Sequence, residues 1–126
     1  MPSPPQPPAV AIVILVEDDT ALLQALRFMF LSEGFDAIAC ETGEALLDLT
    51  LPSGRFCLVI DERLPGMSGI AALQTLRERG VTAPAVMITT HPSERLCAAA
   101  RDALATVIEK PLVGDALAVA VRSVLA

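Results

Sequence analysis

The feature that most limits what this chain can fold into is a regular alternation of two kinds of segment from Ala11 onward. Short runs rich in β-branched and other apolar residues are followed by longer stretches in which apolar residues recur at helical spacing. The strand-like runs are residues 12–16, 35–39, 57–61, 85–89 and 106–109. This alternation predicts an α/β fold in which five βα units build a parallel sheet.

Capping and stop residues delimit the helices expected between the strands. Asp19 or Thr20 can cap the first helix, and Gly34 can end it by adopting a left-handed conformation. The apolar face of this helix is formed by Leu22, Leu26, Met29 and Phe30. The other helices are expected from the Thr42 cap to about residue 50, over 69–79, from Pro92 or Ser93, and over 114–125.

The first, third and fourth strand-like runs are apolar almost throughout, which predicts that helices cover both of their faces. The expected fold is therefore a doubly wound α/β sandwich of the (βα)5 type. Residues 1–10, which hold five of the ten prolines, are interpreted as a Pro-rich disordered leader, and residues 11–126 as one domain. In doubly wound sheets, ligands bind beyond the carboxyl ends of the strands.

Charge and cysteine content exclude several classes of function. The net charge of −6 opposes direct binding to nucleic acid. Cys40, Cys57 and Cys97 form no CxxC pair and have only one histidine to join them, so we expect no zinc site but buried thiols in a reducing compartment. The early apolar run, 9–16, is too short to span a membrane and follows no basic residue, which indicates a cytoplasmic protein.

Polar residues with related chemistry follow four of the predicted strands. They are Glu17, Asp18 and Asp19 after the first, Asp61 at the end of the third, Thr89 and Thr90 after the fourth, and Lys110 with Pro111 after the fifth. Clustered carboxylates repel one another unless a cation joins them, and a hard oxygen donor set favours Mg²⁺. A pocket with Mg²⁺, a hydroxyl and one ammonium suits phosphoryl transfer.

Four segments carry a family resemblance in the same order and strand context. ILVEDD (14–19), LVIDERLPGMSG (58–69), VMITT (86–90) and IEKP (108–111) resemble the CheY-like receiver domain of two-component response regulators. The match runs from Val10 to Ala126, and the DERLPGMSG run is most similar to receivers of nitrogen-fixation-type transcription regulators. The resemblance implies a flavodoxin-like fold, with a five-stranded parallel sheet in the order 2-1-3-4-5.

The same resemblance implies roles for the strand-end residues. Asp61 is the expected phosphoacceptor, and it would bind Mg²⁺ together with Asp18, the backbone carbonyl of Arg63 and, through water, Glu17. Asp19 is interpreted instead as a helix cap.

The resemblance also implies that Lys110 pairs with the phosphoryl oxygen and that Thr89 donates to it. The Lys110–Pro111 bond is expected to be cis.

The chain departs from the family pattern at several positions. Val107 stands where the family usually has Tyr or Phe, Leu112 where an aromatic residue is frequent, and Thr90 where a smaller residue is usual. Residues 101–107 lack the glycine common in that connection. Arg63 and His91 are expected to flank the attacking water, so we predict that these two residues tune dephosphorylation.

The resulting functional hypothesis is a phosphorylation-dependent switch rather than an enzyme that turns over a substrate. Its expected partners are a sensor histidine kinase or phosphotransfer protein and either an effector protein or an output domain, with a homodimer left open. Two alternatives remain at this point. One is a degenerate receiver that acts as a constitutive interaction module; the other is a Mg²⁺-dependent phosphohydrolase of the haloacid dehalogenase type, whose DxDx[TV] motif residues 17–20 do not supply.

Overall fold

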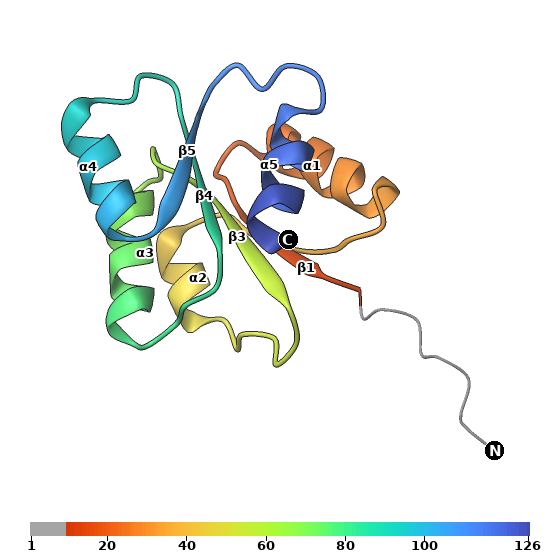
Figure 1. Ribbon diagram of the computed structural model, residues 1–126, viewed down its shortest axis with the longest axis horizontal. Helices are drawn as coiled ribbons and strands as arrows, with labels where there is room; N and C mark the ends of the chain where they lie inside the picture. Colours follow the sequence, from red (N-terminus) through yellow and green to blue (C-terminus); the bar gives the residue numbers. More distant parts are fainter. Residues whose placement is uncertain (1–9) are drawn as a thin grey trace.

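The computed structural model describes residues 10–126, and the predicted leader lies outside these residues except for Val10. Five strands alternate with five helices, as the sequence predicts (Figure 1). The strands are β1 (Ile12–Val16), β2 (Asp36–Cys40), β3 (Phe56–Asp61), β4 (Ala85–Thr89) and β5 (Ala105–Glu109). The helices are α1 (Thr20–Ser32), α2 (Gly43–Asp48), α3 (Gly69–Glu78), α4 (Glu94–Asp102) and α5 (Ala116–Leu125).

All strand pairs are parallel, and the sheet has the predicted order β2-β1-β3-β4-β5. β1 lies between β2 and β3, so Val16 is level with both Cys40 and Ile60. The direction in which successive strands are added reverses at β1, because β2 lies on one side of β1 and β3 on the other. Figure 1 shows α2, α3 and α4 on one side of the sheet, and α1 and α5 on the other. The doubly wound fold is confirmed.

Two apolar cores form because alternate residues of each strand face opposite sides of the sheet. On one side, Ile14, Leu58 and Met87 pack with the buried faces of α2, α3 and α4. On the other side, Leu15 and Val59 pack with α1 and α5. β1, β3 and β4 are buried almost throughout, which confirms their prediction as central strands and leaves only their carboxyl ends for polar groups.

Several predicted boundaries shift by one or two residues for local reasons. β2 begins at Asp36 because the Phe35 N–H donates to the Phe30 carbonyl and so completes the end of α1. α2 ends at Asp48, since the following residue is extended. α5 starts at Ala116 rather than Gly114, whose φ of +63° is not helical. β3 and β5 each begin one residue earlier than predicted.

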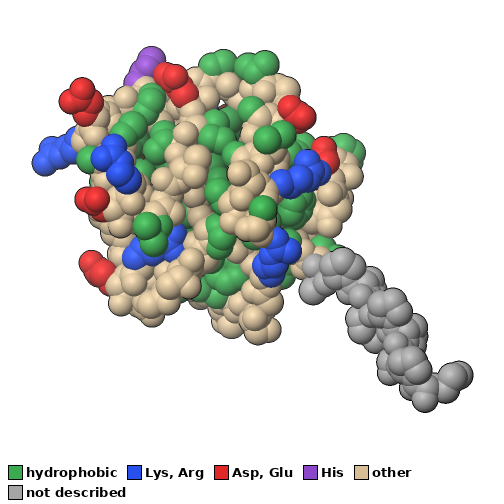
Figure 2. All heavy atoms as spheres, viewed as in Figure 1, with side chains coloured by type: hydrophobic (Ala, Val, Ile, Leu, Met, Phe, Trp, Pro, Cys, Tyr) green, Lys and Arg blue, Asp and Glu red, His purple; other side chains and the backbone are tan. Residues whose placement is uncertain are grey.

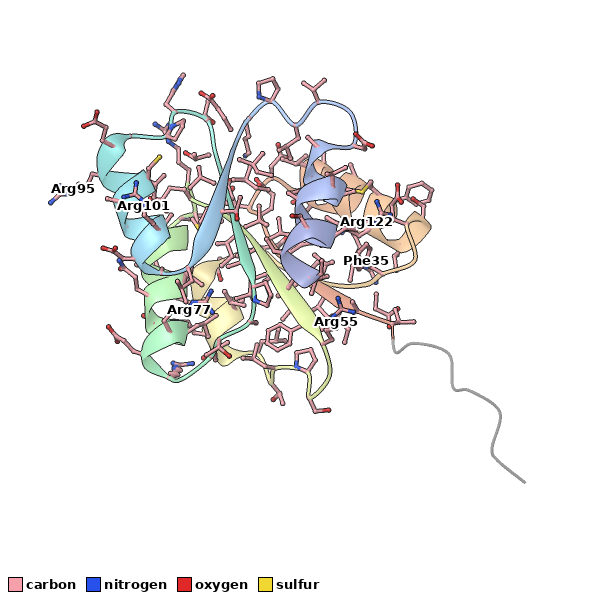
Figure 3. The ribbon with its side chains drawn as sticks, in the orientation of Figure 1. Phe35, Arg55, Arg77, Arg95, Arg101 and Arg122 are labelled. Atoms are coloured by element: carbon pink, nitrogen blue, oxygen red, sulfur yellow. The ribbon has the colours of Figure 1, made fainter. Side chains whose placement is uncertain are left out.

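The connection that lacks glycine is closed by Leu104, whose φ is +59°. Arg77 of α3 joins this turn to the connection between α3 and β4. Its Nε donates to the Ala103 carbonyl at 2.8 Å in the turn, and its Nη1 donates to the carbonyls of Val81 and Ala83 in the connection at 3.0 and 2.7 Å. Figure 3 shows the Arg77 side chain near the lower ends of α3 and α4. Burial lowers the pKa of Arg77 from its ordinary value. One guanidinium therefore donates to one carbonyl at the end of α4 and to two in the connection between α3 and β4.

The surface carries dispersed charge. Figure 2 shows acidic and basic side chains scattered over the face formed by α4, β5 and α5, with apolar side chains between them. Leu104, Val113 and Val119 are exposed apolar residues in this half of the chain. None of the helices in the described range has the length and apolar character needed to cross a membrane.

The prediction that all three cysteines are buried is wrong for one of them. Cys40 and Cys57 are buried in the two cores, whereas Cys97 in α4 is only half-buried. α4 turns a narrow apolar stripe, Leu96 and Ala100, toward the sheet, so its other positions remain partly in contact with solvent.

Candidate functional site

The polar residues predicted at the strand ends meet at one edge of the sheet. Glu17 follows β1, Asp61 ends β3 and Thr89 ends β4, and all three are buried, with exposures of 2 %, 4 % and 4 %. Asp18 lies beside Glu17 but is exposed. Parallel strands bring these residues together because their carboxyl ends point the same way. Among the residues that the structure describes, these three are the buried polar or charged side chains, and they mark this edge as the candidate site.

The three carboxylates form a compact cluster. One oxygen from each of Glu17, Asp18 and Asp61 lies within 4.8 Å of the others. Like charges at such separations repel by about 3–4 kcal/mol at an effective dielectric near 20, so the arrangement favours an added cation. A donor set of carboxylate oxygens, without histidine or thiolate, fits Mg²⁺ and does not favour Zn²⁺.

Lys110 reaches this cluster from the end of β5. Its Nζ lies 3.3 Å from Oδ2 of Asp61 and 3.5 Å from Oε2 of Glu17. The Lys110–Pro111 peptide is cis, as the resemblance implies, and the Lys110 N–H donates to the Thr89 carbonyl at 2.8 Å. This lysine is the only one in the sequence, so no other ammonium group of a lysine is available to the cluster.

The electrostatics of the site follow from burial and crowding. Burial raises the pKa of Glu17 to about 7, and the negative charge of Asp61 adds to the increase, while the Asp19 N–H and Lys110 oppose it. Burial lowers the pKa of Lys110, but the carboxylates of Asp61 and Glu17 outweigh this effect and leave it raised. The ammonium is therefore held in its charged form next to carboxylates that one positive charge only partly balances.

Asp19 caps α1, as predicted. Its Oδ1 accepts the Leu22 N–H at 3.1 Å, and its own N–H donates to Oε1 of Glu17 at 3.2 Å. The cap therefore helps to orient Glu17, while its oxygens are not among the three that cluster.

The other predicted residues surround the site at different depths. Thr90 and His91 are exposed in the connection to α4, and Arg63 is exposed just after Asp61. Val107 is half-buried in β5 and packs on the core beneath α3 and α4, so an aliphatic side chain occupies the position where the family usually has an aromatic one. Leu112 packs on the opposite core.

Three residues that sequence reasoning did not single out shape the segment after Asp61. The carboxylate of Glu62 accepts the Ile70 N–H at 2.8 Å, in addition to the Ser68 side chain that caps α3. The carboxylate of Glu44 in α2 accepts the Met67 N–H, also at 2.8 Å. Gly69 allows α3 to start against β3, because a Cβ there would lie 2.2 Å from the Asp61 carbonyl oxygen. Gly69, the second of the two glycines in the PGMSG run, was the one signal that the sequence offered.

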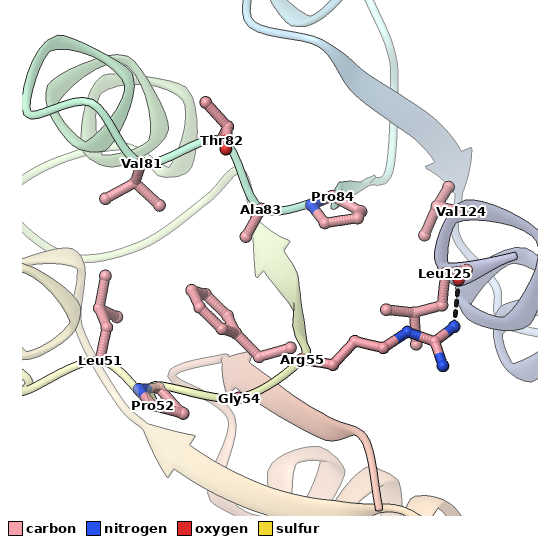
Figure 4. Close-up of a pocket in the computed structure, with 11 residues that line it drawn as sticks. Leu51, Pro52, Gly54, Arg55, Val81, Thr82, Ala83, Pro84, Val124 and Leu125 are labelled. Atoms are coloured by element: carbon pink, nitrogen blue, oxygen red, sulfur yellow. Dashed lines mark hydrogen bonds between the residues drawn. The ribbon is translucent and has the colours of Figure 1, made fainter. Parts of the chain in front are cut away.

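Cavity volume does not identify the site. An apolar groove of about 480 Å³ lies at the other edge of the sheet, where Phe56, Pro84 and Leu125 are among its lining residues. In Figure 4, Arg55 extends from the start of β3 across this groove and donates to the Leu125 carbonyl. None of the clustered carboxylates lines the groove. The clustered carboxylates at the strand ends, and not the groove, therefore identify the candidate site.

Comparisons with known proteins agree with this assignment. The response regulator receiver domain family matches residues 13–122. The chain is 33 % identical over 114 residues to the transcriptional regulatory protein FixJ of Azorhizobium caulinodans, covering 90 % of this chain and 54 % of that protein. It is 37 % identical over 81 residues to nodulation protein W of Bradyrhizobium diazoefficiens, covering 64 % of this chain and 36 % of that protein. The chain thus spans about half or less of the length of these relatives.

Solved structures show the same fold. The response regulator StyR matches with a TM-score of 0.85 at 32 % identity, covering 93 % of this chain and 60 % of StyR. A CheY-like receiver domain protein from Methanospirillum hungatei matches with a TM-score of 0.84 at 23 % identity, covering 93 % of this chain and 94 % of that one. The family match over residues 13–122, together with the strand-end carboxylates and lysine, shows that the chain belongs to the response regulator receiver domain family.

Proposed function

We propose that Asp61 accepts a phosphoryl group from a phosphohistidine on a sensor histidine kinase or phosphotransfer protein. A carboxylate oxygen of Asp61 would attack the phosphorus, the P–N bond would break, and the imidazole leaving group would take up a proton. The observation that carries this proposal is the buried Asp61 carboxylate, which lies 3.3 Å from Lys110 and clusters with Glu17 and Asp18. Such positioning and charge neutralisation are the main requirements of phosphoryl transfer.

The metal proposed for this site is Mg²⁺. Asp18 and Asp61 would hold it directly, the Arg63 backbone carbonyl would be a third protein ligand, and Glu17 would act through water. The oxygen cluster and its excess negative charge support this set. Mg²⁺ bound there would supply positive charge against the oxygens of the transferred group.

Lys110 would then exchange its contact with a carboxylate for one with a phosphoryl oxygen, and Thr89 would donate a hydrogen bond to the same group. Thr89 is buried at the end of β4, beside Glu109, the last residue of β5 before Lys110. We propose that these contacts shift α4 and α5 and so change partner binding. Because Val107 lacks the ring of the usual aromatic residue, the readout would depend on backbone and helix movement.

Exposed residues at the rim would set the lifetime of the phosphorylated form. Arg63, Thr90 and His91 are all exposed near the strand ends. We propose that Arg63 and His91 adjust the rate of dephosphorylation by controlling the access of water to the acyl phosphate. Thr90 would narrow the path to the phosphoryl group. Decay of the phosphorylated protein, followed in Arg63→Ala and His91→Ala, tests this: unchanged decay in both variants would contradict it.

The proposed setting is cytoplasmic, with residues 11–126 as the receiver domain and residues 1–10 as a leader. Its signal would pass either to an effector protein or to an output domain, and a homodimer would be one form of output. FixJ is named a transcriptional regulatory protein, and its greater length leaves room for an output region. The chain would accept one phosphoryl group on its own side chain and not turn over substrate as an enzyme does.

The deciding experiment treats the protein with acetyl phosphate, or with beryllofluoride, in the presence and absence of Mg²⁺. We expect a Mg²⁺-dependent mass increase with acetyl phosphate and NMR shift changes with beryllofluoride, both lost in Asp61→Asn. Asp19→Asn is the matched control, because asparagine keeps the cap of α1. Equal responses in wild type and Asp61→Asn would reject the proposal. No response in either would favour the constitutive module, and turnover of a generic phosphate ester would favour the phosphohydrolase.

A further inference from the structure

The segment 62–68 between β3 and α3 carries the Arg63 carbonyl, yet few bonds hold its middle. Its ends are tied by Glu62, whose N–H donates to the Ile88 carbonyl and whose own carbonyl accepts the Gly69 N–H. Within the described chain, residues 63–67 make one hydrogen bond to another element, from the Met67 N–H to Glu44. The conformation of the middle therefore depends on this contact and on apolar packing of Leu64 and Met67.

The hydrogen bond between Met67 and Glu44 depends on the backbone conformation of the residue before Met67 as well as on the position of Glu44. Oε1 of Glu44 accepts the Met67 N–H at 2.8 Å. The preceding residue, Gly66, has a φ of +72°, and a Cβ there would lie 2.9 Å from the same Oε1. Gly66 thus permits both the turn and the close approach of the carboxylate.

The start of α2 lies directly against this segment. A Cβ on Gly43 would lie 3.4 Å from the Met67 carbonyl oxygen and 3.2 Å from Cβ of Ala72 in α3. Thr42 caps α2 through the Ala45 N–H, which fixes where the helix begins and hence where Glu44 is presented. The packing of α2 on α3 therefore brings Glu44 to the Met67 N–H.

We propose that Glu44 is a positioning residue that holds the β3–α3 segment in the conformation in which the Arg63 carbonyl can bind Mg²⁺. The inference rests on the metal site of the proposed function. Glu44 itself is not a ligand in this proposal, because its oxygens are not part of the carboxylate cluster. It acts through Met67, in the way that outer hydrogen-bond partners orient metal ligands.

The test compares Glu44→Ala, Glu44→Gln and Glu41→Ala with wild type. Glutamine keeps an oxygen acceptor without charge, and Glu41, exposed just after β2, controls for the loss of a negative charge near the same edge. We expect Glu44→Ala to raise the Mg²⁺ dissociation constant about three- to tenfold, and Glu44→Gln and Glu41→Ala to change it by less than about twofold. Calorimetric titration of the unphosphorylated protein measures it.

Hydrogen exchange of the Met67 amide supplies a readout that does not involve the metal. In metal-free protein this amide should exchange about tenfold faster in Glu44→Ala than in wild type, and close to the wild-type rate in Glu44→Gln. If Glu44 acted only through the helix dipole of α2, Met67 exchange and Mg²⁺ binding would change equally in Glu44→Ala and Glu44→Gln, since both variants lose the charge. That result, or unchanged Mg²⁺ binding in Glu44→Ala, would overturn the inference. Failure of wild type to bind Mg²⁺ would instead overturn the metal site, while the exchange data would still test the role of Glu44.

Discussion

The Nζ atom of Lys110 lies 3.3 Å from Oδ2 of Asp61, although 49 positions separate the two residues in the chain. The same ammonium group lies 3.5 Å from Glu17, so one positive charge faces two buried carboxylates. This arrangement links the stability of the protein to the chemistry of its site, because any change in the cationic balance alters the repulsion between the carboxylates.

Lys110→Ala should lower the free energy of unfolding in EDTA by about 1–3 kcal/mol, since it leaves Glu17 and Asp61 without their cation. Added Mg²⁺ should restore more stability in this variant than in wild type, because the metal replaces the lost charge. Urea unfolding with EDTA and with Mg²⁺ measures both effects. Arg95→Ala, at an exposed position of α4, is the control. An equal Mg²⁺ increment in Lys110→Ala and wild type would contradict the prediction.

Gly69→Ala should destabilise the protein by about 3 kcal/mol or more, because the added Cβ would lie 2.2 Å from backbone at Asp61. Helix propensity predicts the opposite, a gain of about 1 kcal/mol, and the steric effect is expected to dominate. Gly54→Ala is the matched control, since no heavy atom lies within 4 Å of a Cβ there. Thermal and urea unfolding compare the two, and similar stabilities would show that β3 and α3 can separate at low cost.

Arg77→Ala should lower the free energy of unfolding by about 2–3 kcal/mol, because it removes the donor to the carbonyls of Ala103, Val81 and Ala83. Arg79→Ala removes one exposed hydrogen bond, to the Leu47 carbonyl, and should lower the free energy of unfolding by less than about 1 kcal/mol. The difference is measured by urea unfolding at neutral pH. Equal losses would mean that water replaces the guanidinium at this turn.

The three thiols should react at very different rates with an aromatic disulfide reagent at pH 8. Burial raises the pKa of Cys57 to about 12 and also raises that of Cys40, so both remain protonated and shielded from the reagent at this pH. Cys97 is half-buried in α4 and should account for the single fast thiol. Cys97→Ser should remove that phase, and urea should release the other two. Fast labelling that persists in Cys97→Ser would contradict the burial of the cores.

Much of this molecule follows from local sequence pattern. Runs of β-branched residues predicted β1 and β4 to the residue, because a central strand needs apolar side chains on both faces. The site could be predicted for a related reason: in a parallel sheet, polar residues directly after buried strands, such as Asp61 and Lys110, meet at one edge. Ends of elements were less predictable, since backbone bonds such as Phe35 to Phe30 decide them.

Only the tertiary structure decided which charged side chains hold the backbone of the connections, both beside that site and at the opposite end of the sheet. Glu44 and Arg77 are ordinary charged residues of helices in the sequence, and their partners, at Met67 and Ala103, are backbone groups that carry no sequence signal. Alternation of apolar and polar residues specifies which face of an element is buried, because burial depends on side-chain type at each position. Contacts between a side chain and a distant backbone depend instead on how helices pack on the sheet, and that geometry arises only when the whole chain is folded.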